Sequence, residues 1–282
     1  ISSLLKNILY PNIVKLSLSS PFGIGRFCIP FANPNFFAYF LNLSFVYFLY
    51  FTPKRHLGPI KFSFLLYLLF ISGSRSGWIV FLITLSIWFV SGVFRFIRNG
   101  DTKQIRLILS SIPIGFVLIY MNFDTIMHST RVKELVSAFT SNNFLAIASA
   151  YDRYNMNIDQ WAFFYISPLI GLGPSKYFIS FVIDNQFMLW TLRNGILGIT
   201  IIVSGCFFLF YNLISKSRNN IFYRFGIFSY FVCISLFLLT GAYLDNYRLF
   251  FITSVYLASI SNKVYKNHNY HNYYKTGLVK SI

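Results

Sequence analysis

Five arginines stand near the ends of apolar stretches of this sequence, and their chemistry suits a phosphate site. A guanidinium group donates parallel hydrogen bonds to phosphate oxygens and keeps its charge when partly buried. The five come from separate segments: Arg26, Arg75, Arg153, Arg193 and Arg248. Each one alone could instead be an anchor that extends to lipid headgroups. Five together favour binding of a phosphate or pyrophosphate group.

Asp184 supplies a candidate general base beside these cations. It precedes Asn185 and a long apolar region, and a carboxylate there can accept a proton from a substrate hydroxyl. Asp152 is a weaker candidate for the same role. The alternative is that Asp184 is a helix N-cap that accepts a hydrogen bond from the N–H of Phe187 or its neighbour. The two roles are compatible.

The segment 151–165 has apolar residues at helical spacing, so we predict a helix there. Arg153, Asn157 and Gln160 form a second, polar stripe on that helix. The helix should stop before Pro168. We expect it to lie along a membrane surface, aromatic side down, with Arg153 facing a cavity. A surface helix with a solvated polar face is the alternative.

Two glycines follow this helix, and the remaining short motifs carry little chemistry. Gly171-Leu-Gly173-Pro174 permits a tight turn and close backbone approach, although such a pair is usually only a turn. His268-Asn-Tyr-His271 lacks a third ligand, and the three cysteines are far apart. No nucleotide-binding or Ser-His-Asp pattern is present. We therefore predict no metal and no cofactor.

The composition indicates that these residues are held by a membrane protein. Hydrophobic residues make up 56% of the 282 positions and charged residues only 11%, against about 25% charged in soluble domains. The net charge of +17 could suggest nucleic acid. Basic residues on the cytoplasmic side of a membrane protein explain it better, so we expect a lipid bilayer and no nucleic acid as partner.

Seven apolar runs predict an all-α, polytopic integral membrane protein with a single domain over 1–282. We expect a long external loop over 122–184, between the fourth and fifth spans, and a cytoplasmic polar tail over 261–282. The fifth run is interrupted at Arg193-Asn194-Gly195. Because residue 1 is Ile and no signal-peptide pattern precedes the first span, we expect the N-terminus and earlier spans to be missing. The seven runs are 36–51, 60–71, 78–94, 105–121, 187–214, 221–239 and 249–260.

Charge sets the predicted orientation of these spans. Asp101 is the one acid among the residues of the basic connections, and the other acids fall on the opposite side. The basic side should be cytoplasmic, which makes the 122–184 loop external. The basic connections carry Lys54, Arg55 and Lys61; Arg95, Arg98, Lys103 and Arg106; Lys216, Arg218 and Arg224; and Lys263, Lys266, Lys275 and Lys280.

Four motifs, in this order and with this topology, resemble the O-antigen polymerase/ligase family (Wzy-type and its relatives). The resemblance covers roughly residues 20–260. The motifs are Arg26-Phe-Cys-Ile-Pro-Phe-Ala-Asn-Pro-Asn35, Ser72-Gly-Ser-Arg75-Ser-Gly-Trp78, Arg153 through Trp161 to Pro168-Leu-Ile-Gly-Leu-Gly-Pro174, and Asp184-Asn-Gln-Phe-Met-Leu-Trp-Thr-Leu-Arg-Asn-Gly195-Ile-Leu-Gly198.

The resemblance implies a membrane glycosyltransferase with a membrane glycosyltransferase-like helical fold. Such an enzyme joins undecaprenyl-pyrophosphate-linked repeat units of a surface polysaccharide, an O-antigen or a capsule. It works at the outer face of the bacterial plasma (inner) membrane, toward the periplasm or exterior. Arg75 and Arg153 match the family's arginines and would contact pyrophosphate or glycan. With Asp184 they are the candidate catalytic residues, and the resemblance leaves open whether Asp184 takes the role of the family's histidine. Many relatives have His-Asn where this chain has Asp184-Asn185.

We expect the remaining candidate site residues to bind the lipid-linked glycan: Arg26, Asn185, Arg193, Arg248, Gly171 and Gly173. A chain-length regulator is a further candidate partner. The alternative function is an O-antigen ligase that transfers glycan to lipid A core or protein, and the departure at Asp184 weighs against it. A polysaccharide flippase or exporter is a third alternative. It would need a polar cavity across the bilayer, and internal repeats are common in such proteins; the sequence indicates neither.

Overall fold

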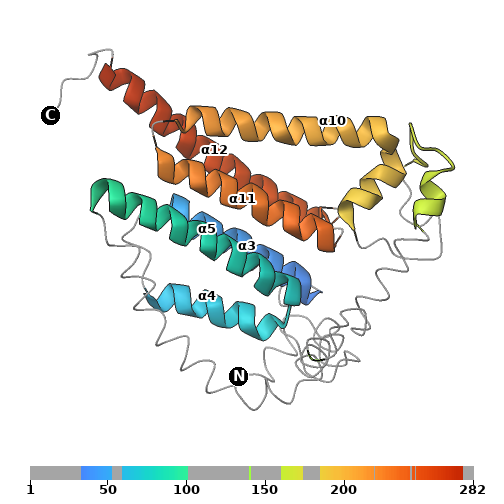
Figure 1. The fold of residues 1–282 in the computed structure, drawn as a ribbon, viewed down its shortest axis with the longest axis horizontal. Helices are drawn as coiled ribbons and strands as arrows, with labels where there is room; N and C mark the ends of the chain where they lie inside the picture. The colour runs from blue at the N-terminus through green and yellow to red at the C-terminus, as the bar shows by residue number, and fades with distance from the viewer. Residues whose placement is uncertain are drawn as a thin grey trace.

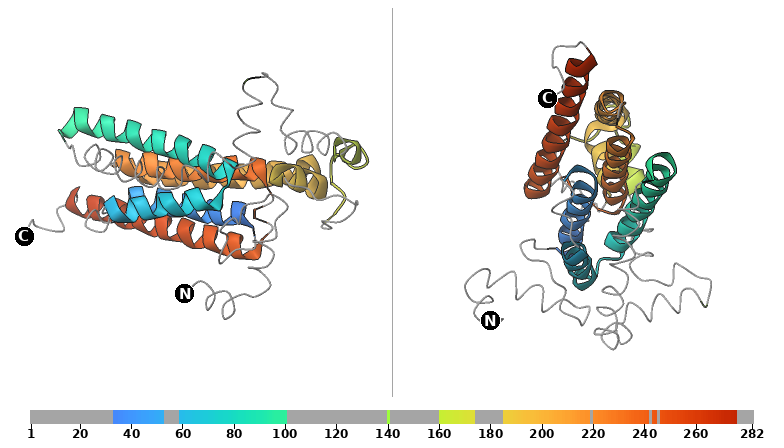
Figure 2. Two further views of the ribbon diagram at one scale, coloured as in Figure 1. Left: turned by 90° about the horizontal axis from the view of Figure 1, so that it is seen from below. Right: turned by 90° about the vertical axis from the view of Figure 1, so that its left-hand side faces the viewer.

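The protein is described by a computed structural model that covers residues 33–52, 59–100, 140, 160–173, 185–218, 220–241, 243–244 and 246–275. These residues form a bundle of helices that run roughly side by side (Figures 1 and 2). No strand occurs among them. Three predicted site residues, Arg26, Arg153 and Asp184, lie outside the described residues, as do the run at 105–121 and most of the predicted external loop.

Six of the seven predicted apolar runs coincide with helices of the described part of the chain. Three of these helices are long and apolar enough to cross a membrane, namely α5, α10 and α11. Their presence supports the coarse prediction of a helical membrane protein. The helices are α3 (Pro34–Phe51), α4 (Pro59–Ser72), α5 (Arg75–Asn99), α10 (Gln186–Lys216), α11 (Ile221–Thr240) and α12 (Tyr247–Lys275).

Side-chain caps define where several of these helices begin. The Asn33 side chain accepts a hydrogen bond from the Asn35 N–H, with Pro34 in the first turn. Ser74 accepts from the Gly77 N–H, and Asn220 accepts from the N–H groups of Phe222 and Tyr223. A cap satisfies N–H groups that have no partner within the helix and contributes about 1 kcal/mol. The starts of α3, α5 and α11 are therefore encoded locally.

Helices α3 and α11 form the centre of the bundle. Helix α3 packs against α4, α5, α11 and α12, while α11 packs against α3, α5 and α10. Gly226 lets α11 approach α3 closely, because a Cβ there would lie 2.6 Å from Cβ of Tyr50. Gly77 does the same between α5 and α3, where a Cβ would lie 2.7 Å from Cβ of Ala38. Small residues at such contacts are typical of helix packing in membranes.

Polar side chains inside the bundle are bonded across helices. The hydroxyls of Tyr39 in α3 and Thr253 in α12 lie 2.9 Å apart, and the Tyr230 hydroxyl in α11 donates to the Thr253 carbonyl at 2.8 Å. The hydroxyls of Ser44 and Tyr256 also lie 2.8 Å apart. Lipid offers no hydrogen-bond partners, so these contacts fix how α3, α11 and α12 face each other.

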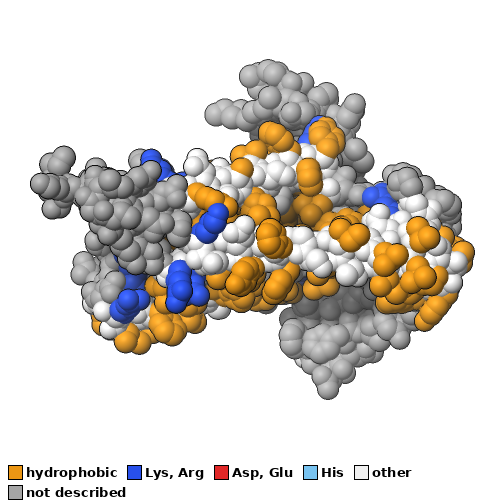
Figure 3. Space-filling model, turned by 90° about the horizontal axis from the view of Figure 1, so that it is seen from above, with side chains coloured by type: hydrophobic (Ala, Val, Ile, Leu, Met, Phe, Trp, Pro, Cys, Tyr) orange, Lys and Arg blue, Asp and Glu red, His pale blue; other side chains and the backbone are white. Residues whose placement is uncertain are grey.

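The cations divide between the two ends of the bundle. Arg75, Arg193 and Arg248 belong to the end at which α3, α5, α10 and α12 begin (Figure 1). Figure 3 shows lysine and arginine side chains gathered at the opposite end of one face, with apolar side chains along its middle. The predicted orientation needs the basic connections to lie at one end of the bundle, and their described residues do. The described cations of the opposite end include Lys61, Arg95, Arg98, Lys216, Arg218, Arg224, Lys263 and Lys266.

Helix α12 is longer than its apolar run. It continues through Lys275, so the first part of the predicted polar tail at 261–282 extends this helix. The ammonium of Lys216 lies 3.6 Å from the ring centroid of Tyr265, which joins the end of α10 to this extension. A cation–π contact of this kind contributes about 0.5–1 kcal/mol at an exposed site. The location of the tail relative to a membrane stays a prediction.

Adding one methyl group at Gly226 tests the α3–α11 contact. We expect Gly226→Ala to lower the free energy of unfolding by about 1–3 kcal/mol, because the new Cβ overlaps Tyr50. Gly205→Ala is the matched control, since that exposed helical glycine has nothing within 4 Å of an added Cβ. It should leave Tm unchanged or raise it. Tm measured on both proteins in the same detergent compares them, and equal values would contradict the packing.

Candidate functional site

The candidate site is built around a bend in α10. Gly195 has φ 62° and ψ −169°, which breaks the helix into 186–194 and 196–216. The bend is the interruption that the sequence predicted at Arg193-Asn194-Gly195. Figure 1 shows the short first piece of α10 leaving the long second piece at an angle, beside the segment 160–173. Arg193 therefore lies at a corner of the helix rather than along a straight rod.

The turn at 168–173 replaces the hydrogen bonds that the bend removes. In a straight helix, the N–H of Ile196 would donate to Leu192 and that of Leu197 to Arg193. Here these N–H groups donate instead to the carbonyls of Pro168 and Leu169, at 2.9 and 3.2 Å. The two carbonyls left without helical partners are satisfied from the same turn.

The Leu172 N–H donates to the Leu192 carbonyl at 2.6 Å, and the Gly173 N–H donates to the Arg193 carbonyl at 3.0 Å. Two motifs that the sequence put forward separately, the glycine turn and the Arg193–Gly195 interruption, thus form one unit. We call the residues 168–173 and 192–197 the bend clasp. Its hydrogen bonds hold the Arg193 backbone against Gly173.

Glycine is required at two positions of the bend clasp. A Cβ at Gly171 would lie 2.4 Å from the Arg193 carbonyl carbon, and one at Gly195 would lie 2.2 Å from the Leu169 oxygen. Both residues also have positive φ. Gly173 has φ 94° but nothing within 4 Å of an added Cβ. The predicted close backbone approach is therefore present at Gly171, while Gly173 contributes only the positive φ of the turn.

A small apolar cluster supports the bend clasp. Met188, Leu189 and Leu192 of α10 are buried against Phe163 and Phe164 of the segment 160–173. This cluster is separate from the main core around α3 and α11. The segment also presents exposed apolar side chains, as a membrane surface segment would: Trp161, Tyr165, Ile166, Leu169 and Ile170.

Of the polar stripe predicted on the helix before Pro168, the structure describes only Gln160. Residues 160–164 are helical and the helix ends before Pro168, as predicted. Gln160, however, is only 1% exposed, and its Oε1 has no hydrogen-bond partner in the described part of the chain. Helical spacing alone does not reveal that this position is buried. The other two stripe positions, Arg153 and Asn157, lie outside the described residues.

Asn185, rather than Asp184, is the residue that caps α10 in the structure. Its Oδ1 accepts from the N–H groups of Phe187 and Met188 at 2.9 and 3.2 Å. The cap alternative raised for Asp184 therefore applies to its neighbour. The adjacent Gln186 is fully buried, and its Oε1 accepts from the Leu244 N–H at 3.1 Å. This bond ties the start of α10 to the α11–α12 turn, close in the chain to Arg248.

Arg75 and Arg248 begin their own helices and do not belong to the bend clasp. Arg75 is half-buried at the first position of α5, next to the capping Ser74, whose hydroxyl donates to Oδ1 of Asn35 at 2.9 Å. Arg248 is exposed. Its Nε donates to the Tyr247 hydroxyl at 3.0 Å, an arrangement that also suits a headgroup anchor.

One polar residue near the α5 start was missed in the sequence. Asn42 is fully buried, and its Nδ2 donates to the carbonyls of Ala38 and Gly77 at 2.9 and 3.1 Å. An amide within the apolar run 36–51 was the available signal, because polar groups at membrane depth have a structural or functional reason. Here the reason is that Asn42 joins α3 to the first turn of α5, which carries Arg75.

The chemistry of the described site is cationic and amide-based. None of the described residues is an aspartate or glutamate, and no group of three potential metal ligands occurs among them. Metal independence stays a prediction. A scan against protein-family models and searches of curated proteins and of solved structures find no match to this chain.

The bend clasp can be tested through exchange of its amide protons. We expect Gly195→Ala to speed hydrogen–deuterium exchange of the 168–173 peptide about tenfold or more, because it removes several hydrogen bonds worth about 1 kcal/mol each. Mass spectrometry of the purified protein in detergent measures this. Gly100→Ala is the control, since Gly100 shares the positive φ and has nothing within 4 Å of an added Cβ. Similar acceleration by both variants would contradict the contact.

Proposed function

We propose that the chain is a bacterial surface-polysaccharide polymerase, a glycosyltransferase that joins undecaprenyl-pyrophosphate-linked repeat units. The observation that carries the proposal is the bend clasp, which holds two family-like motifs together and positions Arg193. The clasp belongs to the end of the bundle at which Arg75 and Arg248 begin their helices. The family resemblance supplies the reaction, and the geometry supports a site at this end.

Electrostatics at this end suit a pyrophosphate group. Helices α3, α5, α10 and α12 all begin here, and the start of a helix carries about half a positive charge. Arg75, Arg193 and Arg248 add full charges, and no carboxylate occurs among the described residues to offset them. A pyrophosphate ester is a fitting anionic ligand, because guanidinium groups match its oxygens.

The proposed reaction is a single displacement at the donor sugar. The acceptor hydroxyl oxygen bonds to the anomeric carbon as the bond from that carbon to the pyrophosphate oxygen breaks. The electron pair leaves with undecaprenyl pyrophosphate, whose growing charge the arginines stabilise. The hydroxyl proton passes to Asp184. Two lipid-anchored substrates held at one membrane face also gain from proximity.

Replacing Arg193 tests the assignment of the reaction to this end. We expect Arg193→Ala to lower the rate of polymer formation about a hundredfold or more, the cost of losing one donor to a developing charge. Arg193→Lys should recover little, because an ammonium lacks the two-pronged geometry. Arg75→Ala, Arg153→Ala and Asp184→Asn should be similarly impaired. The assay follows the length of radiolabelled lipid-linked repeat units with purified protein.

Arg98→Ala is the matched control, since Arg98 is an exposed arginine at the opposite end. It should keep normal activity. Full activity of all four site variants at normal protein levels would overturn the site. A wild-type protein that never lengthens the units would overturn polymerase function. Transfer of finished glycan to lipid A core would favour the ligase instead.

Orientation gives an independent test. In a background without Cys28, Cys206 and Cys233, we expect Arg248→Cys to be labelled by a membrane-impermeant maleimide added outside intact cells. Arg98→Cys should be labelled only after the membrane is opened, because the basic end is expected to be cytoplasmic. Labelling of Arg98→Cys from outside would reverse the orientation and contradict an external active site.

A further inference from the structure

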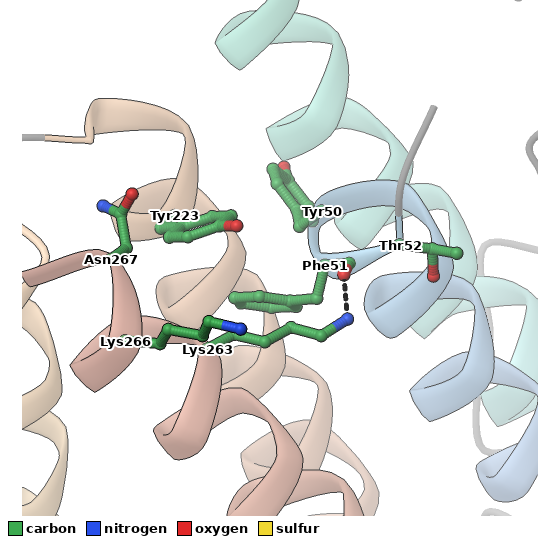
Figure 4. A pocket seen from close by; sticks show the side chains of 7 residues that line it. All are labelled: Tyr50, Phe51, Thr52, Tyr223, Lys263, Lys266 and Asn267. Carbon is green, nitrogen blue, oxygen red and sulfur yellow. Dashed lines mark hydrogen bonds between the residues drawn. The ribbon is translucent and has the colours of Figure 1, made fainter. Parts of the chain in front are cut away.

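A pocket opens at the basic end of the bundle, away from the bend clasp. It has a volume of about 350 Å³ and lies between the end of α3, the start of α11 and the later part of α12. Figure 4 shows the side chains of Lys263 and Lys266 lying alongside each other near the Phe51 ring. The lining residues are Tyr50, Phe51, Thr52, Tyr223, Lys263, Lys266 and Asn267.

The two lysines have different surroundings. The Lys263 ammonium donates to the carbonyl of Phe51, the last residue of α3, and lies 4.7 Å from the Tyr47 ring centroid. Its charge is thereby partly offset, because the end of a helix carries about half a negative charge. Lys266 lies one turn further along α12 and is exposed. The pocket therefore keeps a net positive charge.

No carboxylate among the described residues balances that charge. The sequence has no aspartate or glutamate after Asp245, so every charged side chain of α12 is basic. Lys61, Arg95, Lys216 and Arg224 add to the positive field at the same end. An anion bound at Lys266 would thus be attracted by cationic side chains of several helices. None of the described residues carries a carboxylate that would repel it.

The residues that line the pocket, and its position at the helix ends, suit a lipid. The rings of Phe51 and Tyr223 lie with centroids 5.5 Å apart and give the pocket an apolar side. Thr52 and Asn267 add polar groups. Because α3 ends and α11 begins here, the pocket lies at the level of the helix ends, where the headgroups of a surrounding bilayer would be. Basic pockets between helices on the cytoplasmic side are typical sites for anionic headgroups.

We infer that this pocket binds the phosphate diester of an anionic phospholipid. Lys266 neutralises the single charge of the diester, Lys263 holds the end of α3 in place beside it, and the aromatic rings contact the glycerol and upper acyl chain. The inference is independent of the glycan reaction, since the pocket lies at the other end of the bundle. It assigns the site to a structural or regulatory lipid.

Native mass spectrometry of the purified full chain can test this. The detergent-solubilised protein is titrated with dioleoyl phosphatidylglycerol or dioleoyl phosphatidylcholine. Wild type should bind phosphatidylglycerol more tightly. Lys266→Gln should weaken that binding about fivefold, the effect of about 1 kcal/mol for one lysine near an anionic lipid. The affinity for phosphatidylcholine should not change.

Arg218→Gln is the matched control, because it removes one exposed charge at the same end without lining the pocket. It should keep the wild-type preference, and Tm of both variants confirms that they fold. Equal loss in both variants, or none in Lys266→Gln, would overturn the inference. Binding of inorganic phosphate that depends on Lys266, without any preference between the two lipids, would assign the pocket to free phosphate and also overturn it.

Discussion

Hydrogen bonding inside an apolar bundle is the constraint on which this architecture depends. A phenol or hydroxyl inside an apolar bundle has no water to bond with, so it gains from a partner in its own helix or on another one. Thr253 forms hydrogen bonds with both Tyr39 and Tyr230 and so connects α3, α11 and α12 at one point. With α3 and α11 fixed as the centre, α5 and α10 pack around them.

The same constraint explains the most irregular part of the molecule. Gly195 breaks α10 at a place where unpaired backbone groups would be costly, and the preceding turn at 168–173 supplies the missing donors and acceptors one for one. Irregular backbone in a membrane protein is tolerated where other parts of the protein satisfy its polar groups. The irregularity thus gives the Arg193 region a shape that a straight helix could not provide.

Much of the fold could be predicted from local patterns, whereas the contacts between motifs could not. Apolar runs located the described helices within a few residues, except at the end of α12, and Arg193-Asn194-Gly195 marked the bend. Neither motif indicated that Gly171 would fit against Arg193, because that pairing depends on how the chain returns. The burial of Gln160 was not predicted for the same reason. The polar residues at 261–275 suggested a tail, yet α12 continues through them. Of the candidate catalytic residues, Arg75 lies at the capped start of α5, while Arg153 and Asp184 lie outside the described residues and their roles stay predictions from the sequence.

The order of the bend clasp along the chain has a consequence for biogenesis. The turn at 168–173 precedes α10, so the ribosome has already made it when residues 192–197 emerge. The groups that complete the bend are therefore present before the bent helix is released into lipid. A chain in which these two segments were exchanged would have to insert α10 with its bend unsupported. Translation in the natural order therefore makes the hydrogen-bond partners of the bend available as soon as α10 is complete.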